Sequence, residues 1–253
     1  MESYENYEIN GDELKEVIAK LKNGKAPGED NIPSELYKYS SNKFKARLLR
    51  FFNQIYIQET IPEEWQNAII IPIFKKGDKT DPKNYRGISL LNSCYKIYAK
   101  ILNGKLKLYS ENFLDEEQCG FRKARSCIDA AFTLKLLLEK RREFNLETHF
   151  LFLDYEKAFD EVRRPLLFNI LQNKDIPNPL FAAIKRMYEN NKIKVKLNTK
   201  LTQSISINKG VRQGCPLSPT LFNIYLNEII SEWKDDNIKG IQISRNQNNS
   251  LCR

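Results

Sequence analysis

Two aspartates near the middle of the chain have surroundings typical of groups that do chemistry. Asp154 ends an unbroken apolar run, residues 150–153, and Asp160 follows after Ala158 and Phe159. A short buried strand that delivers an acid at its carboxyl end is a common way to build a metal or catalytic site. The alternative is a structural strand whose acid only caps the next helix. This segment alone favours the structural alternative.

One basic, turn-rich segment has the composition of a phosphate clamp, and a second basic, glycine-containing turn follows it. Arginine can hold a phosphate with its planar fork, and lysine contributes a point charge. Lysine-rich loops are also ordinary solvated surface, and composition gives the two interpretations equal weight. The cations are Lys75, Lys76, Lys79, Lys83 and Arg86 in the first segment, and Arg122, Lys123 and Arg125 in the second.

The overall charge favours a polyanionic partner. The 253 residues include 41 Lys and Arg against 32 acidic residues, a net charge of +9, which indicates nucleic acid before a membrane surface. With 41% hydrophobic residues, the chain can fill the core of one large or two small domains. Five cysteines without CxxC pairing and one histidine argue against a zinc site and a disulfide framework. Without a signal pattern or a run of about 18 apolar residues, we expect a soluble intracellular protein.

Hydrophobic periodicity predicts the elements that position these residues. A strand is expected over 68–74, with Pro72 suiting an edge strand or a bulge. The cation-rich segment then forms a hairpin-like arm, and alternation over 193–207 predicts a β-hairpin. Helices are expected over 14–21, 34–57, 90–109, 127–142, 165–172 and 179–188, and from Ser218 as N-cap with Pro219 in the first turn.

Five ordered segments resemble the reverse transcriptase domain of a non-long-terminal-repeat (non-LTR), LINE-type and RTE-like retrotransposon. Each is short, but five in the family's order are specific, and the resemblance covers about residues 20–253. The segments are 24–28, 71–91, 118–126, 152–160 and 213–219. The resemblance implies an α+β fold with polymerase right-hand fingers and a partial palm of the ferredoxin-like split βαβ type. It divides the chain into a helical N-terminal segment, 1–68, and a reverse transcriptase domain, 69–253.

The resemblance also implies roles around the central aspartates. Asp154 matches the palm aspartate that ligates catalytic Mg²⁺, with Mn²⁺ as the alternative ion, and the backbone carbonyl of Tyr155 adds a ligand. Phe159 matches the aromatic ring beneath the sugar of the incoming nucleotide, where it excludes a 2′-hydroxyl. Asp160 is expected to be a helix cap rather than a metal ligand.

Further roles concern the substrate. Lys75 and Arg86 match the cations that hold the triphosphate, and Gln213 and Gly214 match the loop beside the nascent base pair. The candidate nucleic-acid contacts are Lys76, Lys83, Arg122 and Arg125. The implied partners are an RNA template, a DNA primer or target, and deoxynucleoside triphosphates, without a membrane. The nucleus is the expected location of the parent element.

One departure limits the expected activity. The family places an aromatic-Ala-Asp-Asp strand after the helix that ends near Trp233, and residues 240–253 look like its approach. The polar pair Asp235-Asp236 does not match that strand. Because one aspartate cannot hold two metal ions and the thumb is missing, the sequence predicts an inactive fragment or decayed copy. The alternatives are a nucleic-acid-binding remnant without catalysis and a group II intron-type maturase.

Overall fold

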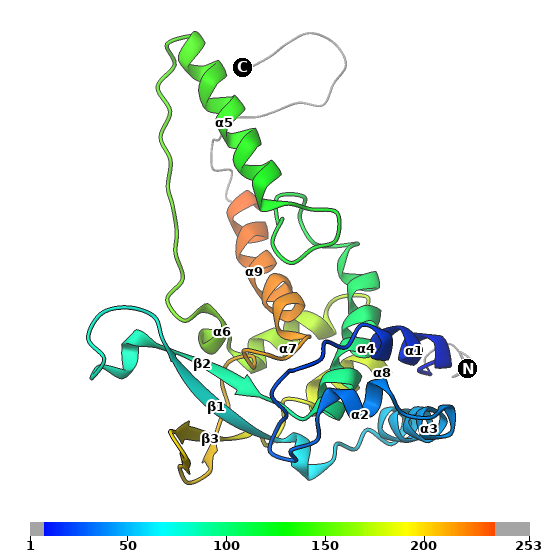
Figure 1. Ribbon diagram of the computed structural model, residues 1–253. Coiled ribbons are helices and arrows are strands. Elements are labelled where there is room, and N and C mark those ends of the chain that lie inside the picture. Colours follow the sequence, from blue (N-terminus) through cyan, green and yellow to red (C-terminus); the bar gives the residue numbers. More distant parts are fainter. Residues whose placement is uncertain (1–7, 236–253) are drawn as a thin grey trace.

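The chain folds as a mixed α+β structure in which a small sheet lies to one side of the helices (Figure 1). The computed structural model describes residues 8–235. Its α-helices are α1 (Gly11–Ala19), α2 (Ser34–Lys38), α3 (Asn42–Gln58), α4 (Ser93–Ser110), α5 (Cys127–Glu143), α6 (Ala158–Glu161), α7 (Arg164–Gln172), α8 (Asn178–Arg186) and α9 (Ser218–Asp235). Its strands are β1 (Asn67–Phe74), β2 (Tyr85–Leu90), β3 (Lys192–Leu197), β4 (Lys200–Leu201) and β5 (Ile205–Ser206). The α+β class is confirmed.

The sheet is built around β1, which pairs with β2 antiparallel and with β3 parallel. The β1–β3 pairing ends at Ile70 opposite Val195, although β1 continues to Phe74 and β3 to Leu197. Pro72 lies in the part of β1 that has no β3 partner, and proline has no N–H to donate to one. The predicted edge strand is therefore wrong for the first half of β1 and fits its second half. The strands β4 and β5 pair with the other side of β3, which confirms the predicted hairpin.

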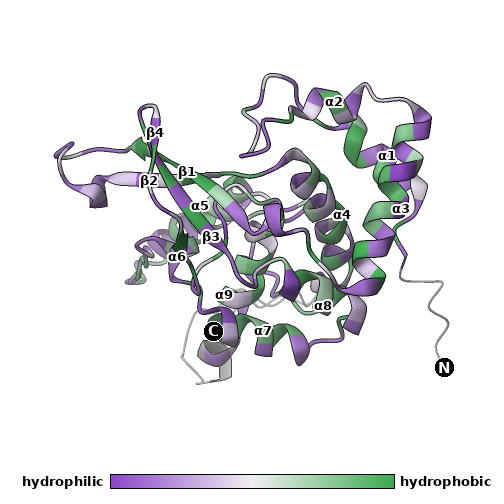
Figure 2. Cartoon of the chain, turned by 90° about the horizontal axis from the view of Figure 1, so that it is seen from below, coloured by the Kyte–Doolittle hydropathy of each residue, from purple (hydrophilic) through white to green (hydrophobic). Residues whose placement is uncertain are grey.

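An aromatic core joins the N-terminal helices to the rest of the chain. Trp65 packs its ring against Phe52 of α3 and against Tyr95 and Tyr98 of α4, with centroids 5.5–6.3 Å apart. All four rings are buried. Figure 2 shows a mixture of hydrophobic and hydrophilic residues along α3 and α4. This mixture is expected of amphipathic helices, which turn one side towards the core. The predicted boundary at residues 68/69 remains a prediction, because the core runs across it.

Two predicted helices have different bounds. The expected helix over 34–57 is divided into α2 and α3, because the Ser41 hydroxyl caps α3 by accepting from the Phe44 amide at 3.3 Å. Leu36 of α2 is 55% exposed. The expected helix over 90–109 begins at Ser93, since Leu90 belongs to β2. Within residues 8–235, none of the helices combines the length and the apolar character needed to cross a membrane.

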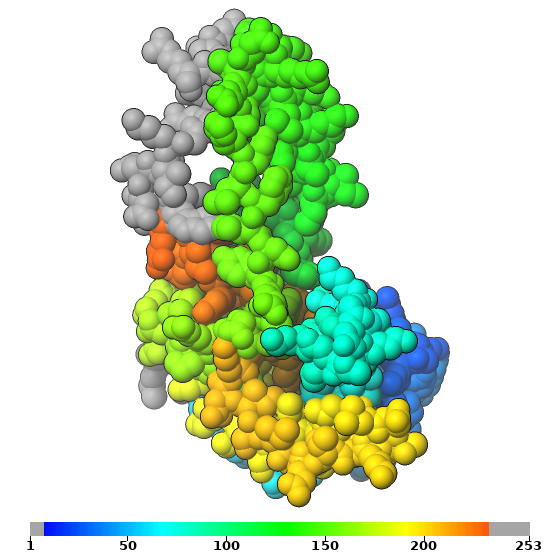
Figure 3. Space-filling view, turned by 90° about the vertical axis from the view of Figure 1, so that its left-hand side faces the viewer, coloured from blue at the N-terminus to red at the C-terminus, as the bar shows by residue number. Residues whose placement is uncertain are grey.

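A helix and an extended segment project from the body of the molecule (Figures 1 and 3). No residue of α5 is buried. The chain returns alongside it through residues 147–155, which form neither helix nor strand. Leu151 and Phe152 are 84% and 81% exposed. The prediction of a buried strand over 150–153 is wrong: within the described part of the chain no strand pairs with it, so its backbone lacks ladder partners and its side chains lack cover.

Candidate nucleotide and nucleic-acid site

The loop 207–217 is fastened to the segment that carries Phe159. The amide of Val211 donates to the carbonyl oxygen of Phe159 at 2.8 Å, and the amide of Gly210 donates to that of Val162 at 2.8 Å. These bonds join residues about 50 positions apart in the sequence. The start of the predicted Gln-Gly loop therefore lies directly against α6.

The same loop is fastened to β2. The amide of Ser89 donates to the carbonyl oxygen of Gln213 at 2.8 Å. Gly214 follows with a φ of +123°, and a Cβ atom there would lie 2.7 Å from the Ser89 carbonyl oxygen. Only glycine fits this conformation and this approach. The structure thus brings the loop of Gln213 and Gly214 onto the strand that begins with Tyr85 and Arg86.

Arg212, between these two attachments, is a buried cation held by carbonyl oxygens. Its guanidinium donates to the carbonyl oxygen of Trp65 at 2.8 Å and to that of Gln66. It lies over the Tyr95 ring, 5.2 Å from the centroid. It forms no ion pair within residues 8–235. Arg212 therefore fixes the loop through hydrogen bonds and ring stacking rather than through a carboxylate.

A second buried arginine supports the other end of the loop. The Arg164 Nε donates to the carbonyl oxygen of Gly210 at 2.9 Å, and Nη1 donates to those of Tyr188 at 2.7 Å and Ile207 at 2.9 Å. Burial lowers the pKa of Arg164 to about 10. Sequence reasoning missed both arginines, because an arginine in a polar or turn-rich stretch is normally exposed. Their flanking residues gave no signal of this role.

The basic arm is ordered by its own hydrogen bonds. The amide of Lys75 donates to the carbonyl oxygen of Asn84 at 2.9 Å, and the Asn84 side chain donates to that of Asp78 at 2.8 Å. The Tyr85 hydroxyl donates to the carbonyl oxygen of Lys79 at 2.8 Å. Five exposed cations of the arm have no ion pair within residues 8–235, namely Lys75, Lys76, Lys79, Lys83 and Arg86. They are available to an anionic ligand.

The pairing of the arm separates its side chains onto two faces. Ile73 lies opposite Arg86, and Phe74 opposite Tyr85. Because successive side chains of a strand point to opposite faces, Lys75 shares the face of Arg86. The two residues predicted to hold the triphosphate therefore lie on one face. Phe74 and Tyr85 lie on the other, with their ring centroids 5.4 Å apart.

Phe159 lies in a small aromatic cluster. Its ring stacks on Phe222 of α9 with centroids 5.1 Å apart and an interplanar angle of 15°, and meets the edge of Phe121 at 6.5 Å. Phe159 is half-buried, so one part of the ring remains accessible. The sugar-selecting role of this residue stays a prediction.

Asp160 does not cap a helix, contrary to the sequence prediction. It lies within the first turn of α6, whose N-cap residue is Lys157 with a φ of +52°. Burial raises the pKa of the Asp160 carboxyl above its ordinary value. Asp160 is held by the close packing of its backbone against Gly210, where a Cβ atom would lie 2.9 Å from the Asp160 carbonyl oxygen.

Asp154 lies on the exposed segment, together with Tyr155. Within residues 8–235 it makes no hydrogen bond or ion pair. No group of three or more metal-ligating side chains occurs in that range. The side chain of Asp235 and the whole of Asp236 and 240–253 lie outside the described residues. The described residues therefore do not form a two-metal site.

The basic turn at 118–126 differs from the arm because its arginines have internal partners. The Arg122 side chain is 4% exposed, pairs with Glu111 at 2.8 Å and donates to the carbonyl oxygens of Asp115 and Gln118. This contradicts its predicted role as a nucleic-acid contact, since its donors are already used. Arg125 pairs with Glu116 at 2.7 Å but is 33% exposed.

Comparison with known protein families shows which family this chain belongs to. A profile of the family described as reverse transcriptase (RNA-dependent DNA polymerase) matches residues 73–247. The chain belongs to this reverse transcriptase family. The match includes the arm, Asp154, Phe159 and the Gln213 loop. It agrees with the non-LTR resemblance of the sequence, because the similar proteins come from transposons and mobile elements.

Curated relatives cover most of this reverse transcriptase chain. It is 31% identical over 219 residues to the transposon TX1 uncharacterized 149 kDa protein of Xenopus laevis, covering 87% of the chain and 17% of the relative. It is 30% identical over 223 residues to the RNA-directed DNA polymerase from mobile element jockey of Drosophila funebris, covering 85% and 24%. A probable RNA-directed DNA polymerase from transposon BS of Drosophila melanogaster is 26% identical, with 87% and 25% covered. The chain thus spans about a quarter or less of these relatives.

Proposed function

We propose that this chain supplies the fingers and part of the palm of an RNA-directed DNA polymerase that copies RNA of a non-LTR retrotransposon. The observation that carries the proposal is the bond between Ser89 and Gln213, which joins the strand of Arg86 to the Gln-Gly loop. The bond holds the strand that carries a proposed triphosphate-binding cation next to the loop in which Gly214 allows close approach of the backbone. The relatives from mobile elements favour this function over that of a maturase.

In this proposal the exposed cations divide into two groups. Lys75 and Arg86 share one face of the arm and contact the triphosphate of a deoxynucleotide. Lys76 and Lys83 contact the phosphates of the template–primer hybrid. Phe159, whose ring is partly accessible, contacts the sugar. The nucleus is the proposed location.

In this proposal, Asp154 and Tyr155 supply only some of the metal ligands. Asp154 and the Tyr155 carbonyl contribute oxygen ligands for Mg²⁺, the hard cation that carboxylates prefer. Because residues 8–235 place no other carboxylate cluster beside Asp154, the remaining ligands come from outside this range. Asp154 and the Tyr155 carbonyl alone are therefore proposed not to complete the metal site.

Binding measurements with residues 1–253 test the proposal. The anisotropy of a labelled RNA–DNA hybrid should report binding that weakens with salt, and Lys76→Ala and Lys83→Ala should each reduce the log–log salt slope by about 1. A photoreactive deoxynucleoside triphosphate, added to the hybrid complex, should label the arm. The double variant Lys75→Ala/Arg86→Ala should lose this labelling.

The matched control is Lys43→Ala, which removes an exposed lysine of α3 that forms no ion pair within residues 8–235 and should leave both signals unchanged. Absence of hybrid binding, or labelling that does not depend on Lys75 and Arg86, would overturn the proposed function. Primer extension with Mg²⁺ tests the proposed metal site separately. Extension that disappears in Asp154→Ala would support Asp154 as a metal ligand, and extension that persists in this variant would contradict that role.

A further inference from the structure

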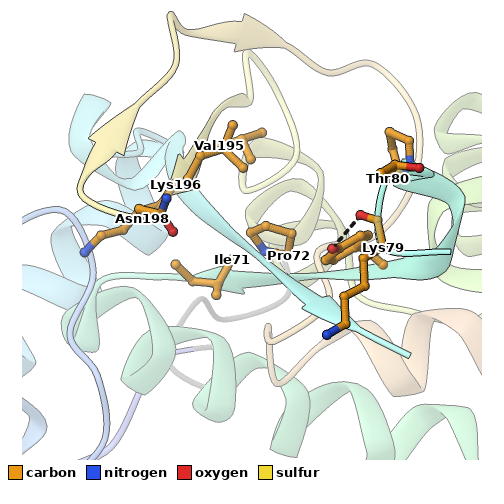
Figure 4. A pocket seen from close by; sticks show the side chains of 10 residues that line it. Ile71, Pro72, Lys79, Thr80, Val195, Lys196 and Asn198 are labelled. Carbon is orange, nitrogen blue, oxygen red and sulfur yellow. Dashed lines mark hydrogen bonds between the residues drawn. The ribbon is translucent and has the colours of Figure 1, made fainter. Parts of the chain in front are cut away.

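A hollow of about 680 Å³ opens where β1 and β3 separate (Figure 4). The two strands are paired up to Ile70 and Val195 and then diverge. On one side of the hollow lie Ile71 and Pro72 of β1, and on the other Val195 to Asn198. Beyond Ile70 and Val195 the two strands no longer pair with each other. This hollow is a consequence of the divergence and the proline, not of a missing side chain.

The lining of the hollow combines an apolar interior with a basic rim. Pro72, Val195, Leu197 and the Tyr85 ring supply apolar surface. The Tyr85 ring is held in place because its hydroxyl donates to the carbonyl oxygen of Lys79 at 2.8 Å. Thr80, Pro82, Lys79, Lys196 and Asn198 complete the lining.

The charge around the hollow is positive. No carboxylate is among its lining residues. The nearby carboxylates of Asp78 and Asp81 accept from the backbone amides of Thr80 and Lys83, both at 2.8 Å. Lys79 and Lys196 form no ion pair within residues 8–235. A ligand with an apolar, planar part and negative charge beside it would complement this surface.

The hollow is separate from the proposed triphosphate contacts. Tyr85 and Phe74 share one face of the arm, and Arg86 and Lys75 share the opposite face. Figure 3 shows the arm above the β3–β5 region on one side of the molecule. Ile71, on the Arg86 face, also lines the hollow, but neither Lys75 nor Arg86 does, so a ligand in the hollow would leave these two cations free.

We propose that this hollow binds one unpaired nucleotide of single-stranded RNA, with its base between the diverging strands and its phosphates on Lys79 and Lys196. This inference rests on the proposed function, and it adds a second RNA contact to it. A duplex fits poorly because its bases are stacked inside, whereas an unpaired base can leave its strand and enter a protein hollow. Exposed backbone groups and Asn198 can satisfy the base edges.

Single-stranded RNA binding by residues 1–253 tests the inference. A labelled, unstructured RNA oligomer should bind about tenfold more weakly to Lys79→Ala/Lys196→Ala, because two phosphate contacts are lost. The matched control is Lys43→Ala/Lys192→Ala, which removes two exposed lysines away from the hollow and should not reduce affinity. Val195→Trp fills the hollow without changing charge and should weaken binding about tenfold, the loss of one stacked base.

Two further measurements identify the base. An oligomer of abasic sites should bind the native chain more weakly, with no further loss on Val195→Trp. A 4-thiouridine oligomer should cross-link to residues 71–85 or 195–198. Equal affinity for the abasic oligomer, an unaffected Val195→Trp variant, or an equal loss in the control double variant would overturn the inference.

The result is distinguishable from failure of the proposed function. Labelling of Lys75 and Arg86 by the photoreactive deoxynucleoside triphosphate should be unchanged in the hollow variants, because neither of these two cations lines the hollow. If labelling persists while RNA affinity does not depend on the hollow, only this inference fails. If labelling is absent in the native chain, the proposed function fails. Circular dichroism and thermal unfolding confirm that each variant is folded.

Discussion

The amide of Ser89 and the carbonyl oxygen of Gln213 form a hydrogen bond of 2.8 Å that joins β2 to the loop before α9. This bond spans 124 positions of the sequence and places the strand of the basic arm beside the Gln-Gly loop. Its geometry requires the backbone of the next residue, Gly214, to approach Ser89 closely. The contact between β2 and this loop can therefore be tested by adding one methyl group at Gly214.

Gly214→Ala should destabilise the fold by about 2 kcal/mol, because a Cβ atom at φ +123° would lie 2.7 Å from the Ser89 carbonyl oxygen. The measurement is the free energy of unfolding in urea. Gly104→Ala is the control: Gly104 lies in α4 with nothing within 4 Å of its Cβ position, and alanine should stabilise the helix by about 0.5–1 kcal/mol. Equal effects of the two variants would contradict a close approach at Gly214.

Arg212→Met should cost about 1–3 kcal/mol, because the buried carbonyl oxygen of Trp65 loses its donor. The carbonyl oxygen of Gln66 still accepts a hydrogen bond from the Lys192 amide, at 3.0 Å, so losing its bond to Arg212 adds less to the cost in stability. Hydrogen exchange should be faster at the amides of Ser89 and Cys215. Arg50→Met, at an exposed position of α3, should change stability by less than about 0.5 kcal/mol. Unchanged exchange at Ser89 would show that Arg212 does not hold the loop.

Arg122→Ala should lower stability by about 2 kcal/mol, because its guanidinium carries hydrogen bonds to Glu111 and to two carbonyl oxygens. The affinity of the folded protein for RNA should not change. Lys83→Ala should show the reverse, with weaker RNA binding and unchanged stability, since Lys83 is exposed and unpaired within residues 8–235. Thermal unfolding and RNA anisotropy on both variants separate the two roles. Loss of RNA affinity in folded Arg122→Ala would restore the role predicted from sequence.

Stability should fall as pH rises above about 10. Burial raises the pKa of four tyrosines, so the folded state keeps protons that the unfolded chain releases near pH 10, at a loss of about 1.4 kcal/mol per pH unit for each phenol. Arg164 acts in the opposite sense, because its pKa is lowered to about 10 and the folded state releases that proton first. Burial also lowers the pKa of Lys96 and Lys100, which oppose the loss as Arg164 does, and raises the pKa of the Cys94 thiol to about 12, which adds to it. Five groups that lower stability outweigh three that oppose them. The tyrosines are Tyr37, Tyr95, Tyr98 and Tyr188.

Tyr98→Phe tests this alkaline loss. The buried Tyr98 hydroxyl has no hydrogen-bond partner within residues 8–235, so phenylalanine should raise stability at neutral pH by about 1 kcal/mol. The variant should also reduce the slope of stability against pH between 10 and 11. Tyr95→Phe loses a hydroxyl contact to Cys215 Sγ, at 3.3 Å, and should not gain stability at pH 7. Urea unfolding from pH 8 to 11 measures both effects, and an unchanged Tyr98→Phe slope would exclude that phenol as a contributor.

The sequence predicted what short-range patterns determine. The arm, β1 and the hairpin after β3 depend on turn residues and alternation within about 20 positions, and the structure confirms them. The strand predicted over 150–153 was wrong because a strand also needs a neighbour, and no local pattern specifies one. Apolar residues alone indicated burial, yet Leu151 is 84% exposed.

The site was predictable in part for the same reason. Resemblance placed Arg86 and Gln213 in one functional region, and the Ser89 bond shows that their segments are joined. Nothing in the sequence showed that Arg164 and Arg212 would be buried without carboxylate partners. Their guanidinium groups donate instead to backbone carbonyl oxygens of residues far away in the sequence, and no local pattern predicts such contacts. Arg122 was assigned to nucleic acid because a basic turn looks the same whether its partner is internal or external.

The exposed segment before Asp154 has a consequence for the behaviour of the protein in solution. Residues 150–153 are uncharged, rich in β-forming side chains and free of proline, and they lie beside an α5 that also exposes Ile128, Phe132 and Leu136. An uncovered strand-like edge of this kind is a template for intermolecular β-pairing. The net charge of +9 opposes association at low ionic strength, so added salt should promote aggregation from this segment even as the fold itself stays intact.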